Sequence, residues 1–420
     1  MKKIQSKKLK QYPTEVLQFL EELEVDHSTG EQVSREKLLQ STIKLAVILQ
    51  NFGITKDDTI GIISLNTWKY IIPIISSFYI GATTTAVNPN LHKDELLHCL
   101  KISKPKIIFI SKNVLDKIRL LRDELSFLKY VMIFDGDSRQ GDEILFKDLL
   151  SEYVDCTLFT IHKEKIEEAV MLYSSGTTGY PKGVTLTSDN LKTIINYCSH
   201  PEILNMNENS IFLVILPIYH IFGLLLVLSC ILDGKRSIIL DRFKPEVFLE
   251  CIQNYKISKL VIVPPIAVFL AKSPLVDKYD ITSLEDILCG AAPPWKRNGG
   301  NYFGKKTVGR DQTGEIYFKG PAVMKGYKNN EIETSHTIDP QGFLHTGDVG
   351  YFDKDGYLYI VDRYHQLSLE DLLLRHPAVK DCGVVGRPDE RAGELPTAFI
   401  VKQPNVDITE DELIAYIAGL

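Results

Sequence analysis

The sequence predicts an α/β fold: a large N-terminal domain of helix-covered, mostly parallel sheets with a short β-rich part, followed by a small α+β C-terminal domain. Three observations predict it. The 420 residues are 44% hydrophobic, which is enough to bury a large core in two or more domains. Helical and strand patterns alternate through the first half, as in a parallel sheet covered by helices. After about residue 290 the strand-like runs become shorter and are separated by Gly, Asp and Asn.

The first half contains helix and strand patterns in alternation. Helices are predicted over Arg35–Asn51 and Tyr70–Tyr79, and strands over Thr59–Ser64, Lys106–Ile110, Tyr130–Phe134, Ala169–Tyr173, Ser237–Leu240 and Lys259–Val263. Ligands of such sheets bind beyond the carboxyl ends of the strands.

The run Ile211–Leu232 has no formally charged residue and is long enough to span a membrane. Pro217 and His220 interrupt it, and both are unfavourable in the middle of a spanning helix. We therefore predict a buried strand over Ile211–Leu216, a turn, and a core helix over Phe222–Leu232, with no transmembrane segment.

The second half is predicted to divide near Arg363. The first domain covers residues 1–363, with its β-rich part at about 310–363, and the second covers residues 364–420. Predicted elements here are the strands Gly314–Lys319, Gly342–His345, Tyr357–Val361, Asp381–Val385 and Thr397–Val401, and the helices Leu369–Arg375 and Glu410–Ala418.

Charge and cysteine content restrict the function. The formal net charge of −6 provides no basic field for a polyanion, so we expect small-molecule ligands and no nucleic acid. The seven cysteines are scattered without a Cys-x-x-Cys pair, which predicts neither a zinc site nor a disulfide framework and favours an intracellular compartment. No metal-ligating residue is predicted.

The strongest motif is the hydroxyl-rich and glycine-rich run at residues 173–184, between an apolar strand and a helix predicted near Ser188. Glycine lets backbone N–H groups approach an anion, hydroxyls donate hydrogen bonds, and lysine supplies positive charge. The candidate phosphate-binding residues are Ser174, Ser175, Gly176, Thr177, Thr178, Gly179 and Lys182. Pro181 and Gly183 stand where a Walker A loop requires Gly and Ser/Thr, so the run is not of that type.

This run resembles the phosphate-loop signature of the adenylate-forming superfamily, in particular the branch of 4-coumarate–CoA ligases, luciferases and related acyl-CoA synthetases. The resemblance covers nearly the whole chain, with further motifs in family order. It implies that Lys182 and Thr178 act on the phosphates of ATP, and that His220, in Leu216-Pro217-Ile218-Tyr219-His220, places the substrate carboxylate.

Three later motifs are similar to family segments around the nucleoside. Gly290, Ala291 and Ala292 resemble a small-residue strand end that leaves room for adenine and the acyl group. By the same resemblance, Asp348 in His345-Thr346-Gly347-Asp348 accepts hydrogen bonds from the ribose hydroxyls, and Arg363 contacts ribose or phosphate beside the domain hinge.

The chain also departs from the family pattern. Between Pro293 and Gly314 the Tyr-Gly-x-Thr-Glu motif, whose glutamate helps hold magnesium, is absent, and so is much of the acyl-pocket wall. The hinge after Arg363 is shortened, and the chain stops at Leu420, before the family's terminal lysine. We therefore expect a truncated C-terminal domain.

The resemblance implies ATP-dependent activation of a fatty or aryl acid to an acyl-adenylate and its transfer to coenzyme A, with Mg²⁺ as cofactor. Two alternatives stay open: a nucleotide-binding protein that has lost catalysis, and a luciferase-like monooxygenase. Relatives suggest a peroxisomal location, but no C-terminal targeting tripeptide is present, so the cytosol is the other expectation.

Overall fold

The computed structural model describes residues 23–26, 30–136, 141–157, 159–174, 180–200, 203, 206–290, 313–354, 358–363, 373–374, 376–389, 393–404 and 406–418. These residues form two compact units. The first lies within Met1–Ala291 and Pro321–Thr334, and the second within Ala292–Gly320 and Ser335–Leu420. The predicted boundary at residue 363 stays a prediction.

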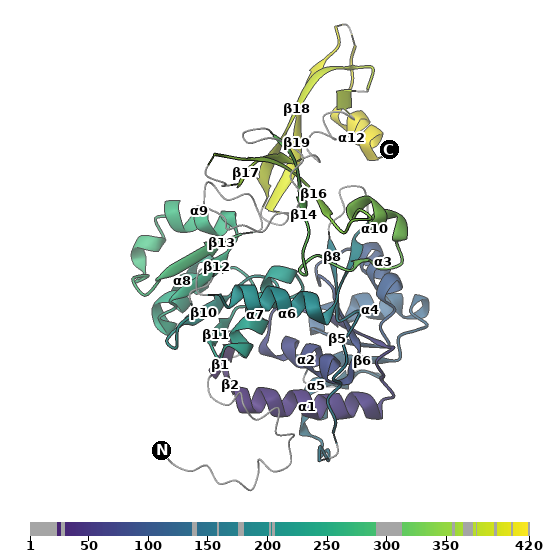
Figure 1. The fold of residues 1–420 in the computed structure, drawn as a ribbon, viewed down its shortest axis with the longest axis vertical. Coiled ribbons are helices and arrows are strands. Elements are labelled where there is room, and N and C mark those ends of the chain that lie inside the picture. The colour runs from purple at the N-terminus through teal and green to yellow at the C-terminus, as the bar shows by residue number, and fades with distance from the viewer. Residues whose placement is uncertain are drawn as a thin grey trace. The chain divides into compact units, whose positions relative to one another are not determined.

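An eight-stranded sheet, with β8, β5 and β6 labelled in Figure 1, contains both ends of the phosphate-loop run. Its order is β15 (Gly326–Tyr327), β9 (Lys182–Leu186), β8 (Val170–Ser174), β4 (Thr83–Ala86), β3 (Thr59–Ile63), β5 (Ile107–Ile110), β6 (Tyr130–Ile133) and β7 (Ile144–Leu145). Strands β8, β4, β3, β5, β6 and β7 are parallel to one another. At one edge, β9 pairs antiparallel with β8, and β15 pairs antiparallel with β9.

A second sheet in the same unit has six strands. Its order is β13 (Asp286–Cys289), β12 (Lys259–Ile262), β10 (Ile211–Val214), β11 (Arg236–Ile239), β1 (Leu23–Asp26) and β2 (Glu31–Ser34). Only the β1–β2 pair is antiparallel.

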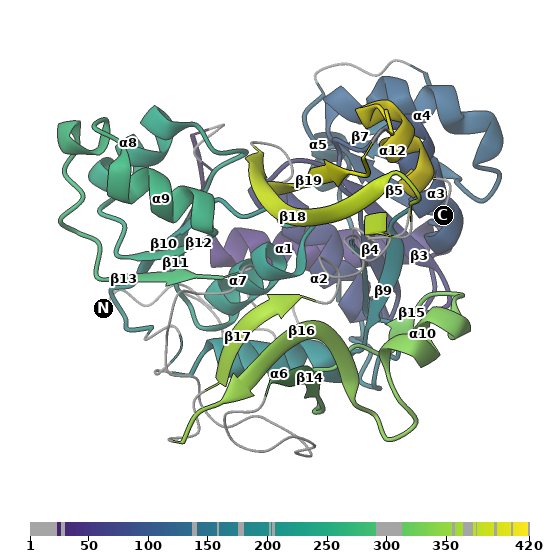
Figure 2. The same ribbon diagram turned by 90° about the horizontal axis from the view of Figure 1, so that it is seen from above.

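Helices cover both faces of these sheets because successive strand residues point to opposite sides. The helices of the first unit are α1 (Arg35–Asn51), α2 (Ile71–Ile80), α3 (Lys93–Ser103), α4 (Leu115–Leu121), α5 (Phe146–Ser151), α6 (Ser188–Cys198), α7 (Ile221–Leu232), α8 (Pro245–Tyr255) and α9 (Pro264–Lys272), with the first turn of α10 (Glu331–Thr337). Figure 2 shows α1 and α2 on one side of the eight-stranded sheet and α3 and α4 on the other.

One core lies between the two sheets. Ile62 and Phe109 of the eight-stranded sheet and Phe212 and Val261 of the six-stranded sheet belong to the same buried cluster, together with residues of α1, α2 and α7. The opposite faces form separate cores, one against α3 and α4 and one against α8 and α9. The first unit is therefore layered helix, sheet, helix, sheet, helix, which confirms the predicted class of helix-covered, mostly parallel sheets.

The second unit is smaller and rich in β-structure. Strands β14 (Gly314–Phe318), β16 (Leu344–Phe352) and β17 (Leu358–Arg363) form an antiparallel sheet, and β18 (Val379–Asp389) pairs with β19 (Gly393–Lys402). A small core beneath β18 and α12 (Glu410–Ala418) includes Val379, Val384 and Leu413. Most of the helix predicted over Leu369–Arg375 lies outside the described residues.

Two strands differ from the sequence prediction. The end of the phosphate-loop run lies in strand β9, which was not predicted and forms because Lys182–Leu186 pairs with β8; helix α6 then begins at Ser188, as predicted. The strand predicted to end at His345 continues to Phe352, because β14 and β17 pair along both of its edges.

The run Ile211–Leu232 forms strand β10, a turn and helix α7, as predicted. Within the described part of the chain, no helix is long and apolar enough to cross a membrane.

Candidate active site

A β-hairpin brings the two ends of the phosphate-loop run together. Strands β8 and β9 are antiparallel, and Ser174 at the end of β8 is the register partner of Lys182 at the start of β9. The predicted phosphate-binding residues Ser175, Gly176, Thr177, Thr178 and Gly179 lie between them and outside the described residues. Both described members of the set, Ser174 and Lys182, therefore stand at the base of the loop.

Helix α3 holds the end of the loop next to Lys182. The His98 ring stacks on the Tyr180 ring with 4.8 Å between centroids. Nε2 of His98 also donates a hydrogen bond to the Pro181 carbonyl oxygen at 3.1 Å. These contacts fix the backbone that leads into Lys182.

The Lys182 ammonium group has two partners from the segment 321–334. It forms an ion pair and hydrogen bond with the Glu333 carboxylate, and it lies 5.6 Å from the centroid of the Tyr327 ring. The Asn330 side chain accepts a hydrogen bond from the Glu333 backbone N–H at 3.1 Å, which caps the start of α10 and positions Glu333. The Lys182 ammonium is thus already paired with a carboxylate of the same unit.

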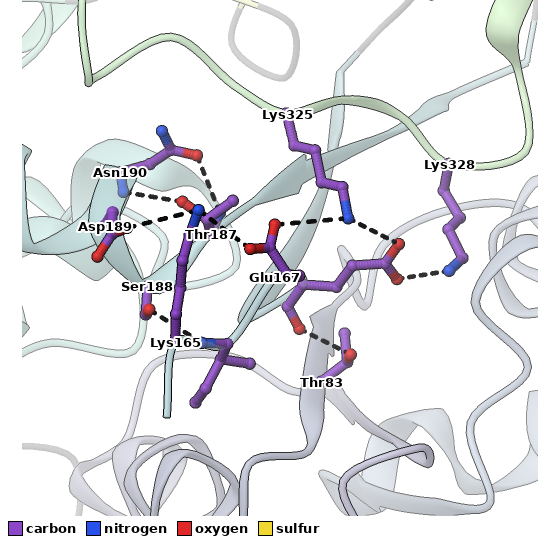
Figure 3. A network of polar contacts seen from close by, with 11 residues as sticks. Thr83, Lys165, Glu167, Thr187, Ser188, Asp189, Asn190, Lys325 and Lys328 are labelled. Atoms are coloured by element: carbon purple, nitrogen blue, oxygen red, sulfur yellow. Dashed lines mark hydrogen bonds and ion pairs between the residues drawn. The ribbon is translucent and has the colours of Figure 1, made fainter. Parts of the chain in front are cut away.

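A network of charged side chains connects the segment 321–334 to the residues that precede β8 (Figure 3). The Glu168 carboxylate accepts a hydrogen bond from Lys328 at 2.5 Å and lies 3.8 Å from the ammonium of Lys325. Backbone pairing adds to this, since the Lys328 N–H donates to the Gly183 carbonyl at 2.7 Å. The segment is therefore tied to the hairpin by both backbone and side chains.

His220 lies at the start of helix α7, and a buried asparagine fixes the turn before it. The Asn66 side-chain amide donates to the Leu216 carbonyl at 2.9 Å, and its oxygen accepts from the Ile218 N–H at 2.8 Å. The His220 N–H donates to the Pro217 carbonyl at 3.0 Å. Sequence reasoning missed Asn66, because its partners are about 150 residues away.

Gly223 allows α7 to pack closely on the same turn. A Cβ at this position would lie 2.2 Å from the Pro217 carbonyl oxygen, so no larger residue fits without movement. One residue earlier on the helix, the Phe222 ring lies 3.0 Å from the position of a Cβ on Gly290. The predicted strand end at Gly290 is thus adjacent to the helix that begins after His220.

The His220 imidazole has a pKa below its usual value, because partial desolvation disfavours the charged ring. The residue remains exposed over part of its surface, so water reduces the size of this effect. A neutral imidazole can donate one hydrogen bond to a carboxylate and accept another.

Asp348 and Arg363 are paired in the second unit. They are register partners on β16 and β17. The Thr346 hydroxyl accepts a hydrogen bond from the Asp348 N–H at 3.1 Å and donates one to the Ile316 carbonyl at 2.7 Å, and Gly347 takes a positive φ of 72°. The structure describes the backbone of Arg363, and the predicted Ala291 and Ala292 lie outside the described residues.

The structure thus shows three local pairs among the predicted residues: Ser174 with Lys182, Gly290 with the helix after His220, and Asp348 with Arg363. Glu333 was not predicted, and no local pattern could have indicated it. Within the described residues, no group of three His, Cys, Asp or Glu side chains is placed to hold a metal ion.

Comparison with known families accounts for this arrangement. The model of AMP-binding enzymes matches residues 10–297, and the model of the AMP-binding enzyme C-terminal domain matches residues 368–419. The chain belongs to the AMP-binding enzyme family. The β8–β9 hairpin, the turn before His220 and strand β16 with Asp348 are therefore parts of an adenylate-forming enzyme fold.

Relatives from two activities are about equally similar in sequence to this AMP-binding enzyme. The luciferin 4-monooxygenase of Photuris pensylvanica is 32% identical over 459 residues, covering 93% of this chain and 84% of that protein. The 4-coumarate–CoA ligase 1 of Petroselinum crispum is 32% identical over 463 residues, covering 94% and 84%. Both alignments are longer than the 420-residue chain, so the relatives carry internal residues without a counterpart here.

Solved structures agree with the family. A red-emitting luciferase from Phrixothrix hirtus superimposes with a TM-score of 0.73 at 32% identity, covering 94% of this chain and 85% of that one. An amide bond synthetase, McbA, from Marinactinospora thermotolerans gives a TM-score of 0.75 at 22% identity, with 96% and 91% covered, and shows the shared fold.

Proposed function

We propose that this AMP-binding enzyme activates a fatty or aryl carboxylic acid with ATP and transfers the acyl group to coenzyme A. The placement of Lys182 opposite Ser174, at the base of the phosphate loop, carries the proposal. The similarity to a 4-coumarate–CoA ligase supports transfer to coenzyme A.

In the first step, a carboxylate oxygen of the acid attacks the α-phosphorus of ATP, and the bond to the leaving pyrophosphate breaks. Negative charge is spread over the phosphoryl oxygens in the transition state. The Lys182 ammonium, released from Glu333, would stabilise that charge electrostatically. In the second step, the thiol of coenzyme A attacks the acyl carbon and AMP leaves.

His220 would orient the acid. Asn66 and Gly223 fix the turn and helix that present the imidazole, and the lowered pKa keeps it neutral near pH 7. A neutral ring can donate a hydrogen bond to the acid. It does not form an ion pair with the carboxylate, and such an ion pair would stabilise the unreacted acid.

Mg²⁺ would come to this site on ATP. Mg²⁺ usually binds through substrate phosphates with one or two carboxylates and several waters. Among the described residues, no three His, Cys, Asp or Glu side chains form a protein cage for the ion. When bound, the ion supplies charge neutralisation, and this chain supplies Lys182 and the loop that hold the phosphates.

A second candidate is binding of ATP without turnover. The Lys182–Glu333 ion pair favours it, because the cation of the loop already has an internal partner. The absent Tyr-Gly-x-Thr-Glu motif favours it as well.

The test uses the purified chain with Mg-ATP and a panel of fatty, cinnamic and benzoic acids. Acid-dependent pyrophosphate release, followed by a thioester when coenzyme A is added, supports the proposal. Tight ATP binding without release with any acid supports the second candidate. Under both candidate functions, the Lys182→Ala variant should bind ATP at least tenfold more weakly. The control variant Lys56→Ala, which changes an exposed lysine elsewhere in the first unit, should bind ATP as the wild type does.

A further inference from the structure

An apolar cavity of about 450 Å³ lies in the first unit among four helices. Its walls come from α1, α2, α6 and α7 and from the segment before β8. The buried wall residues are Leu38, Thr42, Ala169, Leu191, Ile195 and Leu228. The volume is in the range of small-molecule pockets, which are also lined mainly by apolar side chains.

The cavity is separate from the candidate active site, because it lies at the far ends of two shared elements. His220 precedes helix α7, whereas the cavity is lined by Leu228, about 12 Å further along the helix at 1.5 Å per residue. Ser174 ends strand β8, whereas the cavity reaches Ala169, just before its first residue and about 16 Å away.

Two hydroxyls in the cavity wall, of Thr42 and Ser188, are already hydrogen-bonded. The Thr42 hydroxyl donates to the Leu39 carbonyl at 2.8 Å. The Ser188 hydroxyl accepts from the Ile166 N–H at 3.1 Å, as Figure 3 shows. A polar ligand would lose hydrogen bonds with water on entering and find few new ones, so the interior selects a hydrocarbon.

The opening is positively charged. Lys163, Glu164 and Lys192 line it as exposed residues, and Lys192 lies 3.9 Å from the Asp189 carboxylate. Arg35 contributes a third cation, whose guanidinium is hydrogen-bonded to the Ile231 carbonyl. Three cations exceed the two carboxylates beside them, Glu164 and Asp189, which favours a negative group at the opening.

We infer that this cavity binds an amphiphile with one anionic head group, of the long-chain carboxylate class. The hydrocarbon chain fills the apolar interior and the carboxylate stays at the opening near Lys163 and Lys192. The net charge of residues 1–22 argues against the start of the chain as the occupant of the cavity. These residues contain five lysines and three glutamates, so their net charge is positive, like that of the opening. The inference does not depend on the proposed acyl transfer.

Equilibrium dialysis of labelled dodecanoate against the full-length protein, without ATP, tests the inference. The Ile195→Trp variant places a larger side chain in the cavity and should lower the affinity at least tenfold. The double variant Lys163→Glu/Lys192→Glu changes only exposed residues and should lower it about tenfold, whereas Lys56→Glu should not. Dodecylamine, with the same chain and the opposite charge, should not compete.

Binding that survives both the Ile195→Trp and the double charge-reversal variants would overturn the inference, and so would the absence of dodecanoate binding. The His220→Asn variant should bind dodecanoate normally, and a loss of binding there would mean that the fatty acid occupies the active site instead. If only a chain lacking residues 1–22 bound dodecanoate, those residues would be the occupant. Should Ile195→Trp not fold, the surface double variant decides.

Discussion

The Lys182 ammonium is paired with the Glu333 carboxylate, which lies 151 residues further along the chain. Lys182 stands at the base of the phosphate loop, and Glu333 is in the first turn of α10. Both side chains are partly exposed, so the pair contributes little to stability. Its consequence concerns binding, because an anionic ligand that uses Lys182 must displace Glu333.

Replacing Glu333 with Gln should therefore raise the affinity for ATP. A partly exposed pair contributes up to about 1 kcal/mol, which corresponds to at most about a fivefold decrease in Kd. Titration calorimetry with ATP measures the change. Glu331→Gln, on the same helix and exposed, is the matched control and should have no effect. Weaker ATP binding by Glu333→Gln would mean that Glu333 assists the nucleotide.

Gly223→Ala should destabilise the first unit by about 1–3 kcal/mol, because the new Cβ would overlap the Pro217 carbonyl oxygen. Urea unfolding measures the loss. Gly320→Ala serves as control, since its Cβ would meet Phe318 at an ordinary 3.8 Å. Equal stability of the two variants would contradict the close packing of α7 on the turn.

Asn66→Ala should lower both stability and acid activation. The substitution leaves the Leu216 carbonyl and the Ile218 N–H without their buried partner, at a cost of about 1–3 kcal/mol. Because the turn also presents His220, we expect a higher KM for the acid with little change in the KM for ATP. Parallel changes in both KM values would indicate general damage to the fold.

Acid affinity should depend on pH through His220. Its pKa lies below the usual value of about 6.5, and a bound carboxylate favours the imidazolium, so binding of the acid raises that pKa. Affinity should therefore increase as pH falls from the pKa of His220 in the complex towards its lower pKa in the free protein, until the acid itself is protonated near pH 4–5. Titrations of acid binding between pH 5 and 8 should show this slope in the wild type, and His220→Asn should remove it.

The layered first unit could be predicted from sequence because its strands are buried, apolar and alternate with helices. Arg35–Asn51 forms a helix over the predicted residues, and Ile211–Leu232 forms the predicted strand, turn and helix. In these segments local preference and burial favour the same structure.

Strand β9 and the full length of β16 could not be predicted from local pattern. Gly183 and Gly350 resemble turn residues, but each lies in a strand that its neighbours pair. At Gly350 a Cβ would lie 2.4 Å from the Tyr359 carbonyl oxygen, so glycine is needed there for close strand packing. The contacts of Asn66 and Glu333 join residues that are far apart in the chain, so no local sequence pattern predicts them.

Exchange of labelled pyrophosphate into ATP tests adenylate formation most directly, since exchange requires the acyl-adenylate to form and reverse. With a suitable acid and Mg-ATP, we expect exchange by the wild type, at least a hundredfold less by Lys182→Ala, and normal exchange by Lys56→Ala. Exchange by Lys182→Ala at the wild-type rate, or none by the wild type with any acid in the panel, would contradict the account.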